Sequence, residues 1–150
     1  MVIVFSFLTG VITVTQVEAD TDEDRYGNEL KTYISYSKTY GGKAYAKATG
    51  ARFGDLKISI AGVGISLSLP VYKVDNMETT IKYRKGGRTY TVRKEYTGLR
   101  SSKKHSTTIP PGATSVSVVS YVKYKNVAYY SLLGIVSLPR TTYMNIYDSK

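Results

Sequence analysis

A pair of adjacent glycines, Gly86-Gly87, constrains the fold of this chain more than any other feature of its sequence. Two segments in which apolar and polar side chains alternate, 79–85 and 88–94, flank the pair. A two-residue Gly-Gly connection provides the positive φ angles that a type I′ turn requires, because glycine has no Cβ. The sequence therefore predicts a β-hairpin whose turn fixes the pairing of its two strands.

In the predicted register, one surface of the hairpin is apolar and the other is basic. The apolar surface places Ile81 opposite Val92 and Tyr83 opposite Tyr90. The basic surface pairs Arg84 with Thr89, Lys82 with Thr91 and Thr80 with Arg93, and Lys85 faces Arg88 beside the turn. The cations of the hairpin are therefore expected to converge on one side instead of surrounding the strands.

The basic stretch continues past the hairpin as far as residue 104, and Glu95 is the only acid within residues 82–104. The nine bases of this stretch are the predicted anion-binding residues: Lys82, Arg84, Lys85, Arg88, Arg93, Lys94, Arg100, Lys103 and Lys104. Lysine contributes a point charge, and arginine a planar fork that matches phosphate or carboxylate. The alternative is that these bases only protect an edge hairpin from pairing with other chains.

The rest of the chain has the composition of an all-β protein. From Leu30 onward no apolar period of 3.6 residues extends over the length of a helix, whereas Tyr, Val, Ile and Thr are frequent and Gly or Pro recurs between runs. The segments expected as strands are 30–40, 43–49, 56–69, 79–85, 88–96, 114–124 and 127–138. About seven strands at this spacing predict a single antiparallel β-sandwich, with a small β-barrel as the second choice.

Three further local features are predicted along these strands. A hairpin is expected to turn at Gly41-Gly42, with the small side chains of residues 44, 46 and 48 approaching another layer closely. Another hairpin is expected to turn at Lys125-Asn126. The phase of alternation slips at Ala61-Gly62, which predicts a β-bulge within one strand.

The N-terminal region is predicted to direct export. Residues 2–14 are uncharged, and Val17 and Ala19 satisfy the small-residue rule for signal peptidase, so residues 1–19 are interpreted as a secretory signal peptide. The apolar run is shorter than the roughly 20 residues of a membrane-spanning helix, and no transmembrane anchor is expected after processing. The alternative is a buried N-terminal strand. The expected localisation is secreted and extracellular.

The acidic segment 20–29 follows at once and is expected to be a flexible extension of the domain formed by residues 30–150. Its first residues resemble the opening of a calcium loop. Arg25, however, stands where that loop needs glycine, and Lys31 where it needs glutamate, so no metal site is predicted.

Catalysis and cofactor binding are not expected. The chain has no cysteine, which excludes thiolate metal sites, catalytic cysteines and disulfide scaffolds. Residues 30–150 contain one histidine, His105, and five acids that are scattered singly. His105 lies in the basic stretch 101–108, which is interpreted as a solvated loop, and no pair of titratable groups is selected for acid–base chemistry.

Charge and export together suggest a function. Residues 30–150 contain 20 Lys and Arg but only five acids. The absence of cysteine from an exported chain suggests a bacterial source. An exported domain of this charge would meet anionic polymers and lipid head groups of the cell envelope, so we expect a non-enzymatic domain that binds an anionic polymer or membrane surface. A dedicated nucleic-acid partner is not expected, because Tyr83 and Tyr90 are assigned to the core-directed surface and do not alternate with the cations.

Two other classes of function stay open. The alternation within residues 61–69 is typical of a barrel strand with one lipid-facing side, as in a membrane-active or pore-forming toxin, although a spanning strand needs about 9–11 residues. The third class is an extracellular matrix protein that self-associates through strand edges rich in tyrosine, of which the chain has 15.

Residues 36–49 read Tyr-Ser-Lys-Thr-Tyr-Gly-Gly-Lys-Ala-Tyr-Ala-Lys-Ala-Thr, and this segment resembles the opening strands of lactococcin-like β-sandwich bacteriocins. Members of that group are also small, secreted and free of cysteine. The resemblance covers fourteen of the 150 residues, and the tryptophans common in that group are absent here. It does not assign the chain to that family.

Overall fold

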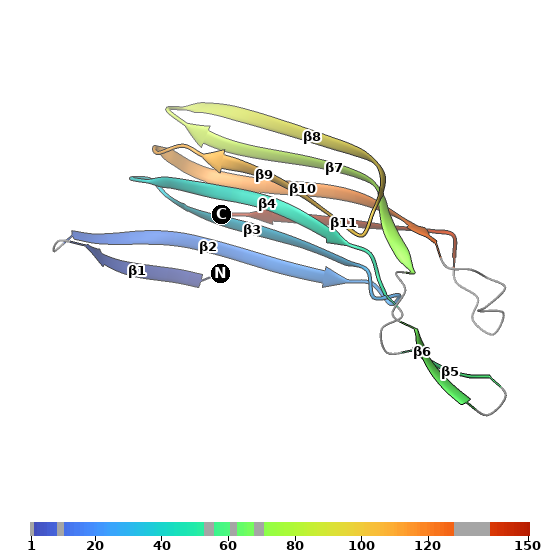
Figure 1. Ribbon diagram of the computed structural model, residues 1–150. Helices are drawn as coiled ribbons and strands as arrows, with labels where there is room; N and C mark the ends of the chain where they lie inside the picture. Colours follow the sequence, from blue (N-terminus) through green and yellow to red (C-terminus); the bar gives the residue numbers. More distant parts are fainter. Residues whose placement is uncertain (1, 9–10, 53–55, 61–62, 68–70, 128–138) are drawn as a thin grey trace.

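The computed structural model describes residues 2–8, 11–52, 56–60, 63–67, 71–127 and 139–150, and the regular elements in this part of the chain are all β-strands (Figure 1). The strands are β1 (Val2–Leu8), β2 (Val11–Glu23), β3 (Glu29–Ser37), β4 (Gly41–Thr49), β5 (Leu56–Ile60), β6 (Val63–Leu67), β7 (Tyr72–Lys85), β8 (Arg88–Arg100), β9 (Ser102–Ile109), β10 (Ala113–Asn126) and β11 (Thr141–Ser149). They form a five-stranded sheet in the order β1-β2-β3-β4-β9, a four-stranded sheet in the order β11-β10-β7-β8, and the pair β5-β6.

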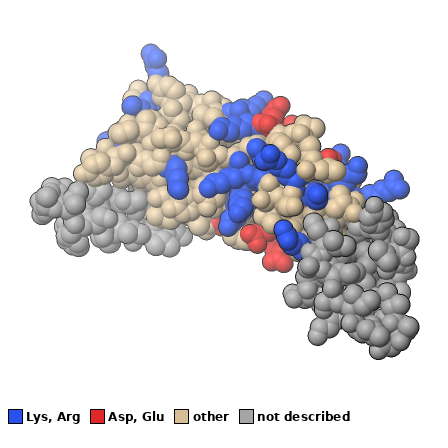
Figure 2. All heavy atoms as spheres, viewed as in Figure 1, with Lys and Arg blue, Asp and Glu red and all other residues tan. Residues whose placement is uncertain are grey.

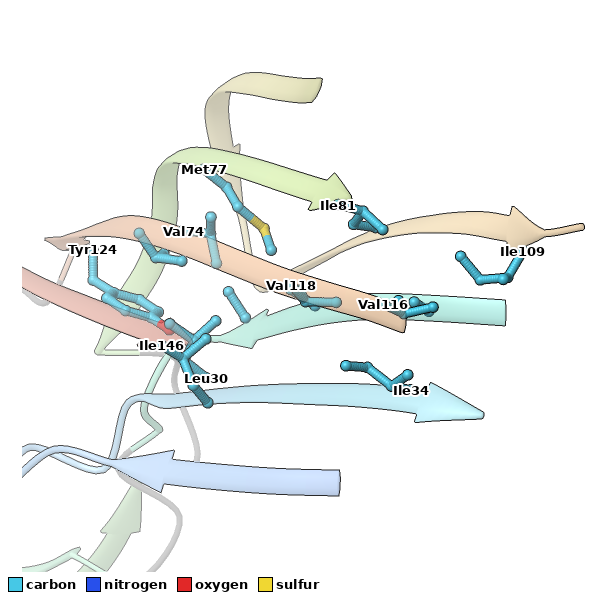
Figure 3. Close-up of a cluster of buried hydrophobic side chains, with 14 of the residues drawn as sticks. Leu30, Ile34, Val74, Met77, Ile81, Ile109, Val116, Val118, Tyr124 and Ile146 are labelled. Atoms are coloured by element: carbon cyan, nitrogen blue, oxygen red, sulfur yellow. The ribbon is translucent and has the colours of Figure 1, made fainter. Parts of the chain in front are cut away.

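The five-stranded and four-stranded sheets stack on each other and enclose an apolar core. Leu30 and Ile34 point into this core from β3, and Ile81 and Val118 point into it from the opposite sheet (Figure 3). Each of these four side chains is at most 1% exposed. Because successive side chains of a strand point to opposite faces, every second residue lies on the outer surface of its sheet. The predicted antiparallel β-sandwich is confirmed.

The β7–β8 hairpin has the predicted register. Gly86 and Gly87 adopt φ angles of 58° and 75°, as the turn requires. Ile81 lies opposite Val92, Tyr83 opposite Tyr90 and Lys85 opposite Arg88. Both strands are longer than predicted, because β7 begins at Tyr72 and β8 ends at Arg100.

The β3–β4 hairpin was predicted in the right place but with the wrong turn. Ser37 lies opposite Gly41, so residues 38–40 form the connection and both glycines belong to β4. A Cβ on Gly42 would overlap the carbonyl oxygen of Ser35, and a Cβ on Gly41 would overlap that of Ile109. These glycines are therefore required for the close approach of neighbouring backbones.

Small side chains line the inner surface of β4, as expected. Ala44, Ala46 and Ala48 are fully buried, and β4 packs against β7 and β10 of the opposite sheet. The short side chains let the two layers approach closely at this point.

Two predictions of strand pairing are wrong. β10 continues through Asn126 and places Tyr124 opposite Thr142 of β11, so there is no turn at Lys125-Asn126. Residues 128–138 of the predicted strand 127–138 lie outside the described residues. Segment 56–69 was predicted as one bulged strand, but β5 and β6 pair with each other in it.

Two strands that follow residue 30, β9 and β11, were not predicted. β9 occupies the stretch interpreted as a basic loop and pairs with β4. Its inward positions carry Lys103, His105, Thr107 and Ile109. Because three of these four inward residues are polar, the sequence shows no apolar alternation there. β11 pairs with β10 and completes the second sheet.

The N-terminal region forms strands β1 and β2. The predicted signal-peptidase site after Ala19 lies within β2, opposite Tyr33, and processing there stays a prediction. Segment 20–29 was expected to be a flexible extension, and in the structure β2 continues to Glu23 and pairs with β3. The carboxylate of Asp24 accepts hydrogen bonds from the backbone N–H groups of Tyr26 and Asn28, each 2.9 Å long, which order the turn into β3.

Candidate functional site

The outer surface of the β7–β8 hairpin carries three neighbouring cations, Lys82, Arg84 and Arg93, which we call the hairpin cations. Lys82 lies opposite Thr91, and Thr80 lies opposite Arg93, so the three basic side chains share one side of the hairpin. All three are exposed. Neighbouring strands are about 4.8 Å apart, so these charges are close enough to contact one anionic group or adjacent groups of one polymer.

Strands β10 and β11 extend this surface and add an aromatic ring. One row across the four strands consists of Tyr147, Val119, Thr80 and Arg93. The side chain of Tyr147 is 65% exposed. The sequence did not indicate this contribution, because β11 was not predicted. An exposed tyrosine thus lies in the same row as one of the hairpin cations.

Two adjoining hollows lie on this surface, with volumes of about 350 and 560 Å³. Lys82, Ser117 and Tyr147 line both of them. Arg84 lines the first hollow, and Arg93 lines the second. A chain of anionic groups lying along Tyr147 would therefore meet a serine hydroxyl and all three hairpin cations.

The cationic area ends at the next row of the sheet. There Glu78 lies opposite Tyr121 on one side and Glu95 on the other. One row further along, Lys123 forms an ion pair with Asp75, with 3.4 Å between Nζ and Oδ2. The hairpin cations therefore occupy the end of the sheet that is near the Gly-Gly turn.

Lys85 and Arg88 lie beside the turn on the core-directed side of the hairpin. They share this side with Tyr83 and Tyr90, whose rings stack with centroids 5.1 Å apart. Both cations are exposed because the hairpin end extends beyond the core. They extend the positive charge around the end of the hairpin but do not line either hollow.

Three more of the predicted residues lie near the edge where β8 leads into β9. The guanidinium of Arg100 and the ammonium of Lys103 lie 5.6 and 4.8 Å from the ring centroid of Tyr96. Lys94 lies opposite Thr79, on the core-directed side of β8. These three cations are therefore separated from the hairpin cations by the sheet itself.

The ninth predicted residue belongs to the other sheet. Lys104 lies on the outer surface of β9, and its Nζ is 4.1 Å from the ring centroid of Tyr45. The structure thus distributes the nine predicted bases over the hairpin surface, the hairpin end, the β8–β9 edge and the opposite face. One continuous surface containing all nine does not form.

The expectation that His105 is solvated is wrong, because this side chain is only 4% exposed. Its Nδ1 is 2.9 Å from Thr79 Oγ1, which is 2.9 Å from Ser120 Oγ. Ser120 in turn donates a hydrogen bond of 3.2 Å to the carbonyl oxygen of Glu78. Since a carbonyl oxygen only accepts, Thr79 must donate to Ser120, and His105 must donate its Nδ1–H to Thr79.

This direction of hydrogen bonding does not activate a nucleophile. A general base would accept the proton of a hydroxyl group, whereas His105 donates to Thr79 and the proton of Thr79 points to Ser120. Burial lowers the pKa of His105, and the charges of Lys103 and Lys94 lower it further. The neutral imidazole is therefore a structural link between the two sheets.

The described residues do not assemble a metal-binding cluster. Within this part of the chain, no cluster of three or more His, Cys, Asp and Glu side chains is arranged to hold a metal ion. A search of the same residues for a helix long and apolar enough to cross a membrane finds none.

Comparisons with protein-family models, with curated proteins and with solved structures find no match to this chain. Function is therefore inferred from the chemistry of the described surface. The most distinctive part of that surface is the group formed by the hairpin cations and Tyr147.

Proposed function

We propose that this protein is a secreted, non-enzymatic domain that binds an anionic polymer or an anionic membrane surface of the cell envelope through the hairpin cations. The observation that carries the proposal is the pairing of β7 with β8, which gathers Lys82, Arg84 and Arg93 around two adjoining hollows. The strands that form this surface all follow residue 19, so the surface does not depend on whether the predicted signal peptide is removed.

The physical basis of binding is electrostatic. Two of the three hairpin cations are arginines, whose planar guanidinium groups form paired hydrogen bonds with phosphate or carboxylate. The exposed ring of Tyr147 adds an amphipathic contact beside them. Because the cations are exposed, binding is expected to weaken as salt shortens the Debye length from about 10 Å at 0.1 M to about 3 Å at 1 M.

The test compares two triple variants with equal charge. The site variant is Lys82→Ala, Arg84→Ala, Arg93→Ala, and the control is Lys38→Ala, Arg52→Ala, Arg140→Ala, which also removes one exposed lysine and two exposed arginines. The probes are inorganic polyphosphate and vesicles of phosphatidylglycerol mixed with phosphatidylcholine. Since a cation near an anionic surface contributes about 1 kcal/mol, the site variant is expected to lose roughly 100-fold in vesicle affinity.

Equal binding by the site variant and the control would refute the proposal, because charge alone and not its arrangement would then explain the affinity. Retention on the vesicles without release of an enclosed dye is the expected result. Dye release would instead support the membrane-active toxin. Sedimentation of the free protein as large assemblies would support the self-associating matrix protein.

A further inference from the structure

The opposite face of the sandwich carries a second group of cations that composition alone did not single out. On the outer surface of the five-stranded sheet, Lys31 of β3 lies opposite Lys47 of β4, and Lys47 lies opposite Lys104 of β9. Lys43 lies on the same side of β4, two rows away. We call Lys31, Lys43, Lys47 and Lys104 the lysine face.

Three like charges in one row oppose the folding of this sheet. Directly opposed side chains of neighbouring strands are about 5 Å apart, and like charges at this distance are destabilising. No carboxylate among the described residues forms an ion pair with any of the three. Figure 2 shows Lys and Arg side chains gathered in a band across the middle of the molecule, in the same region as β3 and β4 of Figure 1, with few acidic side chains beside it. An anionic ligand would relieve this repulsion.

Two tyrosines lie in the row between Lys47 and Lys43, and their rings stack on each other beside two lysine ammonium groups. The rings of Tyr33 and Tyr45 stack with centroids 5.1 Å apart and an angle of 16° between their planes. The Nζ of Lys104 lies 4.1 Å from the ring centroid of Tyr45, and the Nζ of Lys43 lies 5.9 Å from that of Tyr33. A nucleobase needs an open ring face for stacking, whereas these rings already contact each other and lie beside lysine ammonium groups.

From the lysine row and the stacked tyrosine pair, we propose that the lysine face binds a linear polymer that carries an anionic group on each unit and no aromatic ring. Because the hairpin cations lie on the outer surface of the other sheet, the protein then holds two polymer segments on opposite sides of one sandwich. Stacked sheets are about 10 Å apart, so the two segments are bridged at short range. The bridging step rests on the proposed function of the hairpin cations, whereas binding at the lysine face does not.

The chemistry of the two faces also differs. All the cations of the lysine face are lysines, which act as mobile point charges and tolerate irregular spacing of the anionic groups. Two of the hairpin cations are arginines, which favour fixed geometry. The lysine face should therefore accept phosphate and carboxylate polymers with similar affinity.

The test uses the full chain and three proteins of equal charge. The lysine-face variant is Lys31→Gln, Lys47→Gln, Lys104→Gln. The hairpin variant is Lys82→Gln, Arg84→Gln, Arg93→Gln. The control is Lys38→Gln, Lys73→Gln, Lys125→Gln. Binding to inorganic polyphosphate, to polygalacturonate and to oligothymidylate is measured over a series of salt concentrations, and bridging is measured as light scattering at a low ratio of protein to polymer.

The wild type and the control are expected to bind and to scatter. The lysine-face variant should keep binding through the hairpin cations, with a salt slope lower by about 2 because three cation–anion contacts are lost, and should no longer scatter. The hairpin variant should likewise bind without scattering. If the hairpin variant lost all binding and the lysine-face variant bound as tightly as the wild type, the proposal that the lysine face binds a polymer would be overturned. The proposed function of the hairpin cations would stand. The reverse pattern would overturn the proposed function alone.

The identity of the polymer is tested separately from the site. Similar affinities for polyphosphate and polygalacturonate, and no preference for oligothymidylate at equal charge, are the expected results. Much tighter binding of oligothymidylate, lost on Tyr45→Leu, would contradict the proposal and would indicate a single-stranded nucleic acid. The thermal transition of each variant shows whether it is folded. Added polyphosphate should raise the melting temperature of the wild type more than the melting temperature of the lysine-face variant.

Discussion

Replacing Thr79 by valine is expected to destabilise the protein, although the two side chains have nearly the same shape. Thr79 is 1% exposed, and its hydroxyl group joins His105 of one sheet to Ser120 of the other. In Thr79→Val the Nδ1–H of His105 loses its acceptor inside the core, while Ser120 keeps its hydrogen bond to the carbonyl oxygen of Glu78.

The expected magnitude follows from the number of polar groups left without a partner. One orphaned donor in the core costs about 1–3 kcal/mol, and a change of 1 kcal/mol shifts the melting temperature of a chain of this length by about 2–4 °C. The matched control is Thr91→Val on the exposed surface of the same hairpin, which should change stability by less than about 0.5 kcal/mol.

Urea unfolding followed by tyrosine fluorescence or circular dichroism gives the two free energies of unfolding. The ring ¹⁵N shifts of His105 give an independent readout, because the direction of hydrogen bonding requires the proton on Nδ1. If Thr79→Val is as stable as Thr91→Val, or if the proton resides on Nε2, the description of this buried link is wrong.

Two predictions concern pH. Burial lowers the pKa of His105 in the folded protein, so its imidazole takes up a proton more readily in the unfolded chain than in the folded protein. The contribution of this group to stability is therefore present above about pH 6.5 and is lost as the pH falls below that value. His105→Gln should therefore show a smaller loss of stability than the wild type between about pH 7 and 5, measured as urea midpoints. The pKa of Asp148 is raised, so the pH dependence of its contribution has the opposite direction. Burial and the negative charges of Glu18 and Asp20 raise this pKa, and together they outweigh the hydrogen bond from Thr32, which lowers it. Its contribution is present below about pH 4 and is lost as the pH rises through the raised pKa, so Asp148→Asn should gain stability relative to the wild type from about pH 4 to 7. Identical pH profiles for a variant and the wild type would contradict either prediction.

The hairpin around Gly86-Gly87 could be predicted because two independent signals agree there. The turn needs glycine at two positive φ angles, and only one register places the apolar residues of both strands on the same side. Local information was therefore sufficient for this part of the fold and for the position of the hairpin cations.

The pairing of β10 could not be derived in the same way. Both of its surfaces carry apolar side chains, so the alternation does not select a partner, and Lys125-Asn126 provides no clear turn signal. Its actual partners, β7 and β11, are fixed by packing across the sheet. The pairing of β10 is thus determined by tertiary contacts, and a short window of sequence contains no information about such contacts.

The missed strands β9 and β11 share a physical cause. Their inward positions include His105 and Asp148, which become acceptable in the interior only through hydrogen bonds to Thr79 and Thr32 of other strands. Charged and polar inward residues hide the period of two that predicts a strand. The contribution of Tyr147 to the hairpin surface was missed for the same reason, because it depends on β11.

The passage of the chain from β8 in one sheet to β9 in the other has a consequence for the order of folding. Strands β7 and β8 are joined by a two-residue turn, and such hairpins form within about 1–10 μs. Strand β9 instead pairs with β4, more than fifty residues earlier in the chain. Closing so long a loop has an entropic cost, so this pairing is expected to form later than the β7–β8 hairpin. Lys104 therefore comes to lie opposite Lys47 late in folding, and this pairing of like charges forms only when the remaining layers can hold it in place.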